Sequence, residues 1–335
     1  MIVCLVSCSE ATSTSEATST TISENIITNS ISNSPSPIST QTSIPATSTT
    51  LPAVSTDTPT IEMSTDTPFP TETQTHTVIP WPTREIYFDG ARITFIDNAG
   101  FLITVGDKKV LVDAIFDSYG RNIGPPQELI QRIVNAEPPF DQIDLVIATH
   151  NHVDHFSADL VREHLRNNEQ AMFVSSPDVV RQMKQAGEEF DERLIQVNLQ
   201  SGESSRLSVN EIELECFNIT HGISSILNME VIITVDDYII FHSGDLSADS
   251  LIEDADGLAN FNNYQLSQKE IDIALLPSYY FFEDEFVTLI VEGIQARYVS
   301  PMHYPYQYPP DEIENNFSNA VVFKDTLTSW VIPKE

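Results

Sequence analysis

The chain has 335 residues and a formal net charge of −33, and it contains no apolar run of about 18 residues that could cross a membrane as a helix. Residues 84–335 carry 42 of the 49 acidic residues and all 16 Lys and Arg, a net charge of −26, which disfavours binding to nucleic-acid phosphates. With two of its three cysteines in the first eight residues, the chain is not a disulfide-stapled scaffold.

The first eight residues are apolar and end in Leu5-Val6-Ser7-Cys8. This tetrapeptide resembles the lipobox of bacterial lipoproteins, in which the cysteine carries the lipid. The resemblance implies an anchor at Cys8 and an extracytoplasmic, cell-surface location. Seven residues precede Cys8 and none of them is basic, whereas a secretory signal has a basic start and a longer apolar run. We interpret residues 1–8 as the remnant of a longer lipoprotein signal; an ordinary apolar N-terminus is the alternative.

Residues 9–83 have the composition of a disordered linker. Among these 75 residues are 35 Ser or Thr and nine Pro, and the first basic residue of the chain is Arg84. Such a segment buries too little apolar surface to offset the entropy of ordering it. As a random coil it would span about 50 Å, which suits a stalk between an anchor and a domain.

Residues 84–335 are expected to form a single domain, which begins with an antiparallel meander. Three short β-rich segments, 92–96, 101–105 and 110–114, are separated by turn residues. A helix is predicted to begin at Pro125 and to end before Pro138, because proline favours a first helical turn and stops a helix that reaches it.

Helices and strands alternate through the rest of the domain. Strands are predicted at 144–149, 172–175, 194–199, 213–220, 229–235, 238–242, 271–276 and 297–300. Helices are predicted at 157–166, 176–187 and 284–292. Strands at both ends of the domain with helices between them indicate an α/β fold, with two sheets covered by helices on their outer faces.

Metal-binding side chains crowd the segment that follows the buried strand 144–149. This segment reads His150-Asn151-His152-Val153-Asp154-His155. Three imidazoles and a carboxylate within six residues cannot all point into an apolar core. Imidazole nitrogens and carboxylate oxygens suit zinc and similar divalent ions, so the segment predicts a metal site.

Three later strands each end next to a further candidate ligand. His221 follows the strand 213–220, Asp245 follows 238–242 in a Ser-Gly-Asp turn, and His303 follows 297–300. Each of these residues alone is weak evidence for a metal. Together they supply a third ligand for one ion, a bridging carboxylate, and a last ligand for a second ion.

The motif His150-X-His152-X-Asp154-His155, followed by His221, Asp245 and His303, resembles the metallo-β-lactamase superfamily over residues 90–303. The ending Pro301-Met302-His303-Tyr304 is similar to the branch that contains ascorbate-phosphate lactonases and related phosphodiesterases. The resemblance implies an αββα sandwich with a dinuclear site. It implies that His150, His152 and His221 hold one ion, that Asp154, His155 and His303 hold the other, and that Asp245 bridges them.

Two divalent ions at such a site would activate a shared hydroxide for attack on an ester, lactone or phosphodiester bond of a small substrate. Zinc is the expected metal, with manganese and iron as alternatives. Asp154 is the catalytic candidate, because it could orient the nucleophile and accept its proton. The sequence leaves the oligomeric state open.

Two other classes of function compete with this prediction. One is a di-iron redox enzyme on the same fold, although that class usually has a carboxylate where this chain has His152. The other is a surface binding protein that keeps its metal without turnover. Hydrolysis assays separate the binding protein from a hydrolase.

Several further residues have two interpretations each. Asp113 either orients a ligand imidazole or is an ordinary turn residue. His242 either supports Asp245 or is structural, while His164 and Cys216 are expected to be buried structural residues. Two aromatic groups either rim the pocket or pack on helices; they are residues 279–282 and the set Tyr304, Tyr306 and Tyr308.

Overall fold

The computed structural model describes residues 90–117, 124–185, 187, 189–222, 226–253, 256–303 and 310–334. Every described residue belongs to one compact unit, within Thr75–Glu335. The predicted anchor and linker, and the set Tyr304, Tyr306 and Tyr308, lie outside the described residues.

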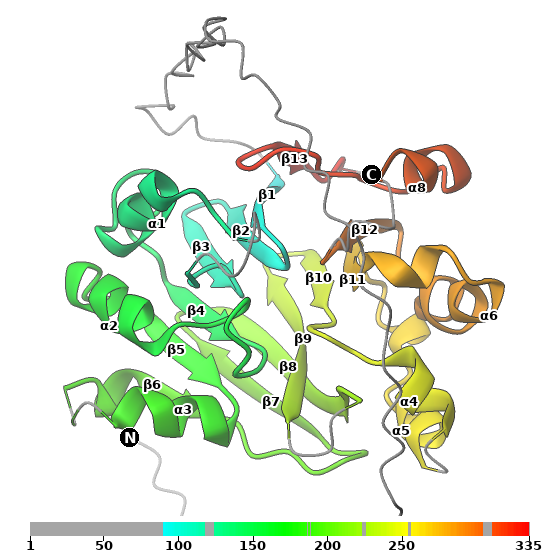
Figure 1. Cartoon of the computed structure of the whole chain (residues 1–335), viewed down its shortest axis with the longest axis horizontal. Helices are drawn as coiled ribbons and strands as arrows, with labels where there is room; N and C mark the ends of the chain where they lie inside the picture. The colour runs from blue at the N-terminus through cyan, green and yellow to red at the C-terminus, as the bar shows by residue number, and fades with distance from the viewer. Residues whose placement is uncertain are drawn as a thin grey trace, which may run out of the picture. The chain divides into compact units, whose positions relative to one another are not determined.

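The first sheet has the strand order β13-β1-β2-β3-β4-β5-β6. Its strands are β1 (Ala91–Asp97), β2 (Gly100–Val105), β3 (Lys108–Val112), β4 (Leu145–Ala148), β5 (Met172–Ser175), β6 (Leu194–Gln196) and β13 (Ser329–Val331). The antiparallel pairs β1–β2 and β2–β3 confirm the predicted meander, and β3 to β6 then run parallel. Strand β13 returns from the end of the chain and pairs antiparallel with β1 (Figure 1).

Three helices cover the outer face of this sheet (Figure 1). They are α1 (Gln127–Val134), α2 (Ala158–Asn167) and α3 (Pro177–Lys184). Each places an apolar stripe against the strands, for example Leu129 and Ile133 of α1 and Val161 and Leu165 of α2. This spacing of four residues is close to one helical turn, as the sequence pattern predicted.

The second sheet has the strand order β12-β11-β10-β9-β8-β7. Its strands are β7 (Ser204–Val209), β8 (Ile212–Thr220), β9 (Leu227–Val235), β10 (Tyr238–His242), β11 (Ile273–Pro277) and β12 (Tyr298–Met302). Strands β7 to β10 are antiparallel, whereas β10, β11 and β12 run parallel. The carboxyl ends of β8, β10, β11 and β12 therefore lie at one edge of this sheet.

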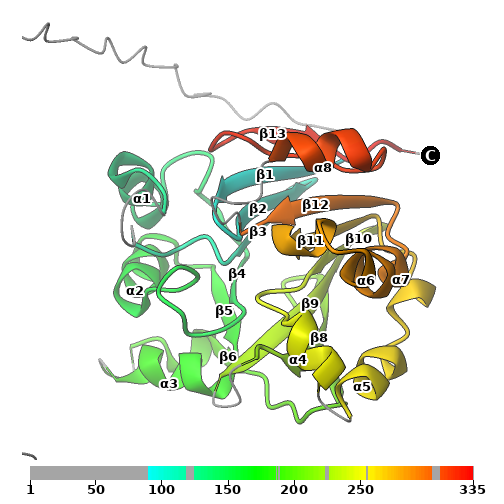
Figure 2. The same cartoon turned by 45° about the vertical axis from the view of Figure 1, so that its right-hand side comes forward.

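Helices also cover the outer face of the second sheet (Figure 2). The α-helices are α4 (Ala248–Glu253), α5 (Gly257–Asn263), α6 (Asp284–Phe286), α7 (Glu292–Ile294) and α8 (Pro310–Asn316). A π-helical stretch, Val287–Val291, joins α6 to α7, so the predicted helix 284–292 is present with a widened middle. Short 3₁₀ helices occur at Asp191–Arg193, Leu266–Gln268 and Ser278–Phe281.

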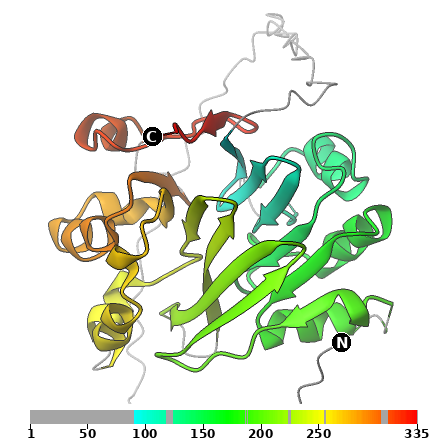
Figure 3. The same cartoon turned by 180° about the vertical axis from the view of Figure 1, so that it is seen from behind.

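The two sheets pack against each other through a shared apolar core. This core combines residues of the first sheet, such as Ile103 and Ile147, with residues of the second, such as Val231 and Leu275. Helices lie on the outer face of each sheet, as the front and rear views show (Figures 1 and 3). The predicted αββα sandwich is confirmed.

Besides the short 3₁₀ helices, two strands and three α-helices were absent from the sequence-based prediction: β7, β13, α4, α5 and α8. Strand β7 has the polar sequence Ser-Ser-Arg-Leu-Ser-Val and alternates between exposed and half-buried positions, which suits an edge strand. Strand β13 is three residues long, too short to show a period. Within the described part of the chain, no helix has the length and apolar character needed to span a bilayer.

Candidate metal centre

All seven predicted ligands come together at one edge of the sandwich. Four of them follow β4, and the other three follow the carboxyl ends of β8, β10 and β12. Their ligand atoms form two groups, His150, His152, His221 and Asp245 in the first and Asp154, His155 and His303 in the second. Within each group these atoms lie within 4.8 Å of one another.

The segment 150–155 is a tight loop fixed at both ends. The amide N–H groups of His155 and Phe156 both donate to the carbonyl of His152, at 3.1 and 3.0 Å. Phe156 forms a parallel bridge with Ile115, and Ser157 N–H donates to the carbonyl of Ile115 at 3.0 Å. These bonds turn the chain back onto the first sheet and bring the imidazoles of the loop close together.

In the first group, three imidazoles surround a common point. The ring centroids of His150, His152 and His221 lie 4.6 to 4.7 Å apart in every pair. Asp245 Oδ2 lies 3.5 Å from His150 Nε2 and 3.6 Å from His221 Nε2. Four ligand side chains thus converge from three separate strand ends.

In the second group, Asp154 Oδ2 lies 3.3 Å from His303 Nε2, and the His155 and His303 rings are stacked at 5.5 Å. Asp245 reaches this group as well. Its Oδ1 lies 3.1 Å from His155 Nε2, and its Oδ2 lies 3.6 Å from His303 Nε2. Asp245 therefore stands between the two groups, at the position expected of a bridging ligand.

Several buried polar atoms of these side chains have no hydrogen-bond partner among the described residues. They are Nε2 of His150 and both ring nitrogens of His221, while Nε2 of His155 and Oδ1 of Asp245, 3.1 Å apart, face only each other. Buried polar atoms are normally paired, because leaving one unpaired costs about 1–3 kcal/mol. Since these atoms are nitrogen and oxygen donors that face one another, the residues fit divalent metal ions.

The charges and the burial of the cluster shift the pKa values of its members in both directions. Burial and the neighbouring His155 lower the pKa of His150 to about 2, so this imidazole is neutral at pH 7. Burial alone would raise the pKa of Asp245, but His155 and His303 hold it well below its ordinary value. Burial would lower the pKa of His155, but the carboxylates of Asp245 and Asp113 raise it well above its ordinary value.

Asp113 contacts a ligand directly, which decides between its two interpretations. Its Oδ2 lies 2.8 Å from His155 Nδ1, and its oxygens accept hydrogen bonds from the N–H and the hydroxyl of Thr149, both at 2.7 Å. The Thr149 hydroxyl in turn lies 3.0 Å from His150 Nδ1. Asp113 is therefore the residue that orients His155 toward the cluster, a common arrangement behind metal ligands.

His242 and Asn228 hold the turn that presents Asp245. His242 Nδ1 accepts the N–H of Gly244 at 3.1 Å, and its Nε2 bonds the carbonyl of Ala99 at 2.8 Å. Asn228 Oδ1 accepts the N–H of Asp245 at 3.0 Å, and its amide donates to Ser243 O at 3.1 Å. His242 therefore supports Asp245. The sequence offered no signal for Asn228, because it lies inside a strand.

The remaining candidate residues are not members of the two ligand groups. His164 is fully buried between α2 and α1, where its Nδ1 lies 2.6 Å from the carbonyl of Ile133. Cys216 is a buried free thiol of the inter-sheet core, and burial raises its pKa to about 12. In the group 279–282, Tyr280 and Phe281 are buried, and the Tyr279 hydroxyl donates to Leu246 O at 2.9 Å. These aromatic residues pack against helices.

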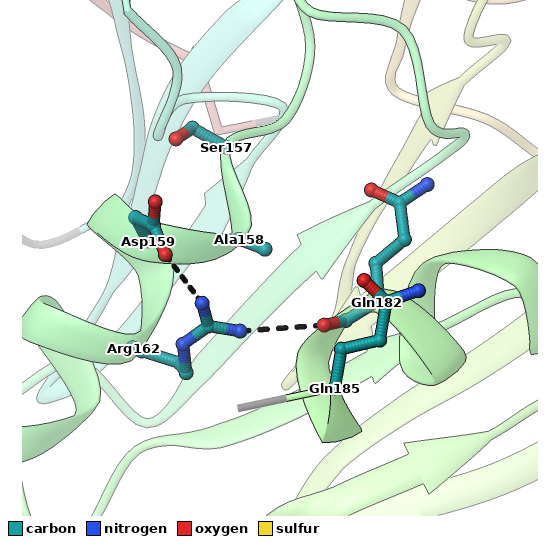
Figure 4. Close-up of a pocket in the computed structure, with 6 residues that line it drawn as sticks. All are labelled: Ser157, Ala158, Asp159, Arg162, Gln182 and Gln185. Atoms are coloured by element: carbon teal, nitrogen blue, oxygen red, sulfur yellow. Dashed lines mark hydrogen bonds and ion pairs between the residues drawn. The ribbon is translucent and has the colours of Figure 1, made fainter. Parts of the chain in front are cut away.

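A surface pocket lies between α2 and α3 (Figure 4). It is lined by Ser157, Ala158, Asp159, Arg162, Gln182 and Gln185. Arg162 is engaged there, because it pairs with Asp159 and donates to the carbonyl of Gln182 at 3.3 Å. None of the seven predicted ligands lines this pocket, so the candidate site is the histidine and aspartate cluster.

The chain is similar to several known proteins. A family model described as a β-lactamase superfamily domain matches residues 108–304. A UPF0173 metal-dependent hydrolase of Hyperthermus butylicus is 24% identical over 214 residues, which cover 63% of this chain and 82% of that protein.

Solved structures show the same likeness of fold. Igni18, a metallo hydrolase of the archaeon Ignicoccus hospitalis, matches with a TM-score of 0.51 at 18% identity, over 72% of this chain and 98% of that one. YhfI of Bacillus subtilis, a metallo-β-lactamase fold protein, matches with a TM-score of 0.50 at 15% identity, over 72% and 99%.

Proposed function

Because the chain belongs to the β-lactamase superfamily and is a metal-dependent hydrolase, we propose that it cleaves an ester, lactone or phosphodiester bond of a small substrate at a site for two divalent ions. The observation that carries the proposal is the position of Asp245 between the two groups of ligands, within 3.6 Å of four imidazoles. A carboxylate has two oxygens and can serve two ions at once.

The ligands divide as the two groups do. His150, His152 and His221 hold the first ion, Asp154, His155 and His303 hold the second, and Asp245 serves both. When bound, such ions lower the pKa of water toward neutrality and stabilise negative charge that develops on a substrate oxygen. Zinc suits this mixture of imidazole and carboxylate, and manganese or iron would use the same ligands.

We assign to Asp154 the role of accepting the proton of the attacking water. Burial would raise its pKa, but the hydrogen bond with His303 and the charge of His155 hold the pKa at about 2, so the carboxylate is ionised at pH 7. Its side chain is 22% exposed, whereas Asp245 is 14% exposed and His155 is wholly buried. An ionised and accessible carboxylate can accept a hydrogen bond from the attacking water and orient it.

The charge of the domain limits the substrate. A net charge of −26 on residues 84–335 repels long polyanions, so the proposed substrate is a small molecule rather than a nucleic acid. We further propose that Cys8 and the Ser/Thr-rich segment tether this hydrolase outside the cytoplasm.

Metal analysis combined with a hydrolysis screen tests the proposed function. We expect about two divalent ions per purified chain, and turnover of at least one carboxylic ester, lactone or phosphodiester that a chelator abolishes and added Zn²⁺ restores. Protein with no bound metal, even after reconstitution, would contradict the proposal. Two ions without hydrolysis would favour the non-catalytic binding protein, and iron with oxygen-dependent turnover would favour the redox enzyme.

A further inference from the structure

Asn98 links two ligands of the second group that are far apart in sequence. It lies in the turn between β1 and β2, and its side-chain amide donates to Asp154 twice, to the main-chain carbonyl at 3.1 Å and to Oδ2 at 3.3 Å. Its own carbonyl accepts the N–H of His303 at 2.9 Å. One residue of the first sheet thus holds the loop after β4 and the end of β12.

His303 needs such a contact because its backbone leaves the sheet. Its φ is 53°, in the left-handed region that residues other than glycine rarely adopt. Its N–H bonds Asn98, and its carbonyl accepts the hydroxyl of the buried Ser278 at 3.2 Å. Both main-chain polar groups of His303 are therefore fixed from outside its own strand, which sets the direction of its imidazole.

Each candidate ligand of the second group is therefore contacted by a residue that can fix its position. Asp113 orients His155, and Asn98 contacts both Asp154 and His303. Among the hydrogen bonds of the described residues, none joins Asn98 to a candidate ligand of the first group. We propose that Asn98 is a positioning residue for the second metal ion, an inference that rests on the proposed two-ion function.

The backbone conformation of Asn98 allows a substitution that removes the side chain and keeps the main chain as it is. Its φ of 48° is left-handed, and glycine adopts that conformation without steric cost. Asn98→Gly keeps the carbonyl that holds His303 and deletes only the amide that holds Asp154. Asn98→Ala deletes the same amide and adds a left-handed strain of about 1 kcal/mol.

Asn210 offers a matched control. It occupies the turn between β7 and β8 with φ of 50°, and its amide donates to the carbonyl of Asp144 at 3.0 Å. Asn210→Gly therefore makes the same chemical change at the same backbone conformation, without contact to a ligand.

The experiment is a stepwise titration of the full-length, metal-free protein with Co²⁺ against a competing chelator, followed by the absorption spectrum of the bound ion. We expect two binding steps in the wild-type protein. Asn98→Gly and Asn98→Ala should weaken the second step by about 10- to 100-fold and change its spectrum, while the first step stays as in wild type. Asn210→Gly should show both wild-type steps.

The possible failures are distinguishable. Two wild-type steps that both variants of Asn98 reproduce would overturn the inference on Asn98 and leave the proposed function standing. Equal weakening of both steps would overturn it too, because Asn98 would then act on the whole fold. A wild-type protein that binds fewer than two ions would contradict the proposed function and the inference with it.

Discussion

The Nδ1 atom of His155 lies 2.8 Å from Oδ2 of Asp113, although the two residues are 42 positions apart. The same carboxylate accepts two hydrogen bonds from Thr149, so its position is fixed before any metal binds. Because Nδ1 donates to Asp113, Nε2 is the nitrogen of His155 that faces Asp245. The contact thus decides which atom of His155 is available to an ion.

Asp113→Asn should lower the affinity for the second ion by about 10- to 100-fold, because an amide has only one oxygen and cannot accept all three hydrogen bonds that the carboxylate accepts from Thr149 and His155. Asparagine tolerates the φ of 45° at this position, so the backbone should be kept. Competition titration with a chelator measures the effect. Asp144→Asn is the control, since Asp144 accepts the N–H of Lys109 at 2.9 Å and contacts no ligand. Equal affinities in wild type and Asp113→Asn would contradict the assigned role.

Asp245→Ala should lower the affinity for both ions by at least about 100-fold, whereas His303→Ala should lower mainly the affinity for the second ion. The reason is that Asp245 lies against imidazoles of both groups and His303 against only one. Elemental analysis after dialysis measures the retained metal. Asp237→Ala, an exposed position in the turn between β9 and β10, makes the same change of charge and should keep both ions. Full metal content in Asp245→Ala would show that the ligand assignment is wrong.

Gly244→Ala should destabilise the protein and release metal. A Cβ at this position would lie 2.3 Å from Asn228 Oδ1 and 3.0 Å from Thr149, and both neighbours support the ligands. Gly106 has a similar φ, 59° against 53°, but an added Cβ there meets nothing within 4 Å.

Gly106→Ala is therefore the control that isolates backbone strain. It should lower the melting temperature by about 2–4 °C, the effect of roughly 1 kcal/mol in a domain of this size. Gly244→Ala should lower it by at least about twice as much, because steric overlap is added to strain. Calorimetry measures both melting temperatures. Equal shifts would mean that the turn before Asp245 accommodates the added methyl group without a further loss of stability.

His164 should make stability depend on pH. Its Nδ1 lies 2.6 Å from the carbonyl of Ile133 and its Nε2 lies 3.2 Å from the amide of Asn168, so both nitrogens are used by the neutral ring. Burial lowers the pKa of His164 from 6.5 to about 4. The unfolded chain therefore binds a proton that the folded protein does not, and stability falls as pH falls from about 6.5 to about 4.

The expected loss is about 3 kcal/mol over that interval, and His164→Gln should not show it. Urea unfolding of both proteins at pH 7 and pH 4.5, with a chelator present, gives the difference, since the other histidines titrate equally in both. Parallel pH profiles would mean that His164 is protonated inside the fold.

Removal of residues 1–83 should leave the domain intact. That segment contains many prolines and no basic residue, so we expect the protein that begins at Arg84 to keep its melting temperature, metal content and turnover. A lower melting temperature would move the domain boundary toward the N-terminus.

Cys8→Ser in the native host should shift the protein from the membrane fraction to the soluble fraction. An unchanged distribution would refute the lipid anchor alone.

The sequence by itself located the seven candidate ligands and predicted the sandwich class. Four of the seven ligands lie in one loop after an apolar strand, and the others each follow a predicted strand, so local patterns sufficed. Periodicity also located the helices of the first sheet, because each buries a stripe at helical spacing.

Only the tertiary structure decided how the ligands are held. Asn98 meets Asp154 across 56 positions, and Asn228 meets Asp245 across 17, with neither asparagine marked by any local pattern. The pairing of β13 with β1 likewise joins the two ends of the domain. Such contacts depend on strand register and on the packing of the two sheets. These are properties of the folded chain as a whole, since hydrogen bonds between distant segments leave no period in the sequence.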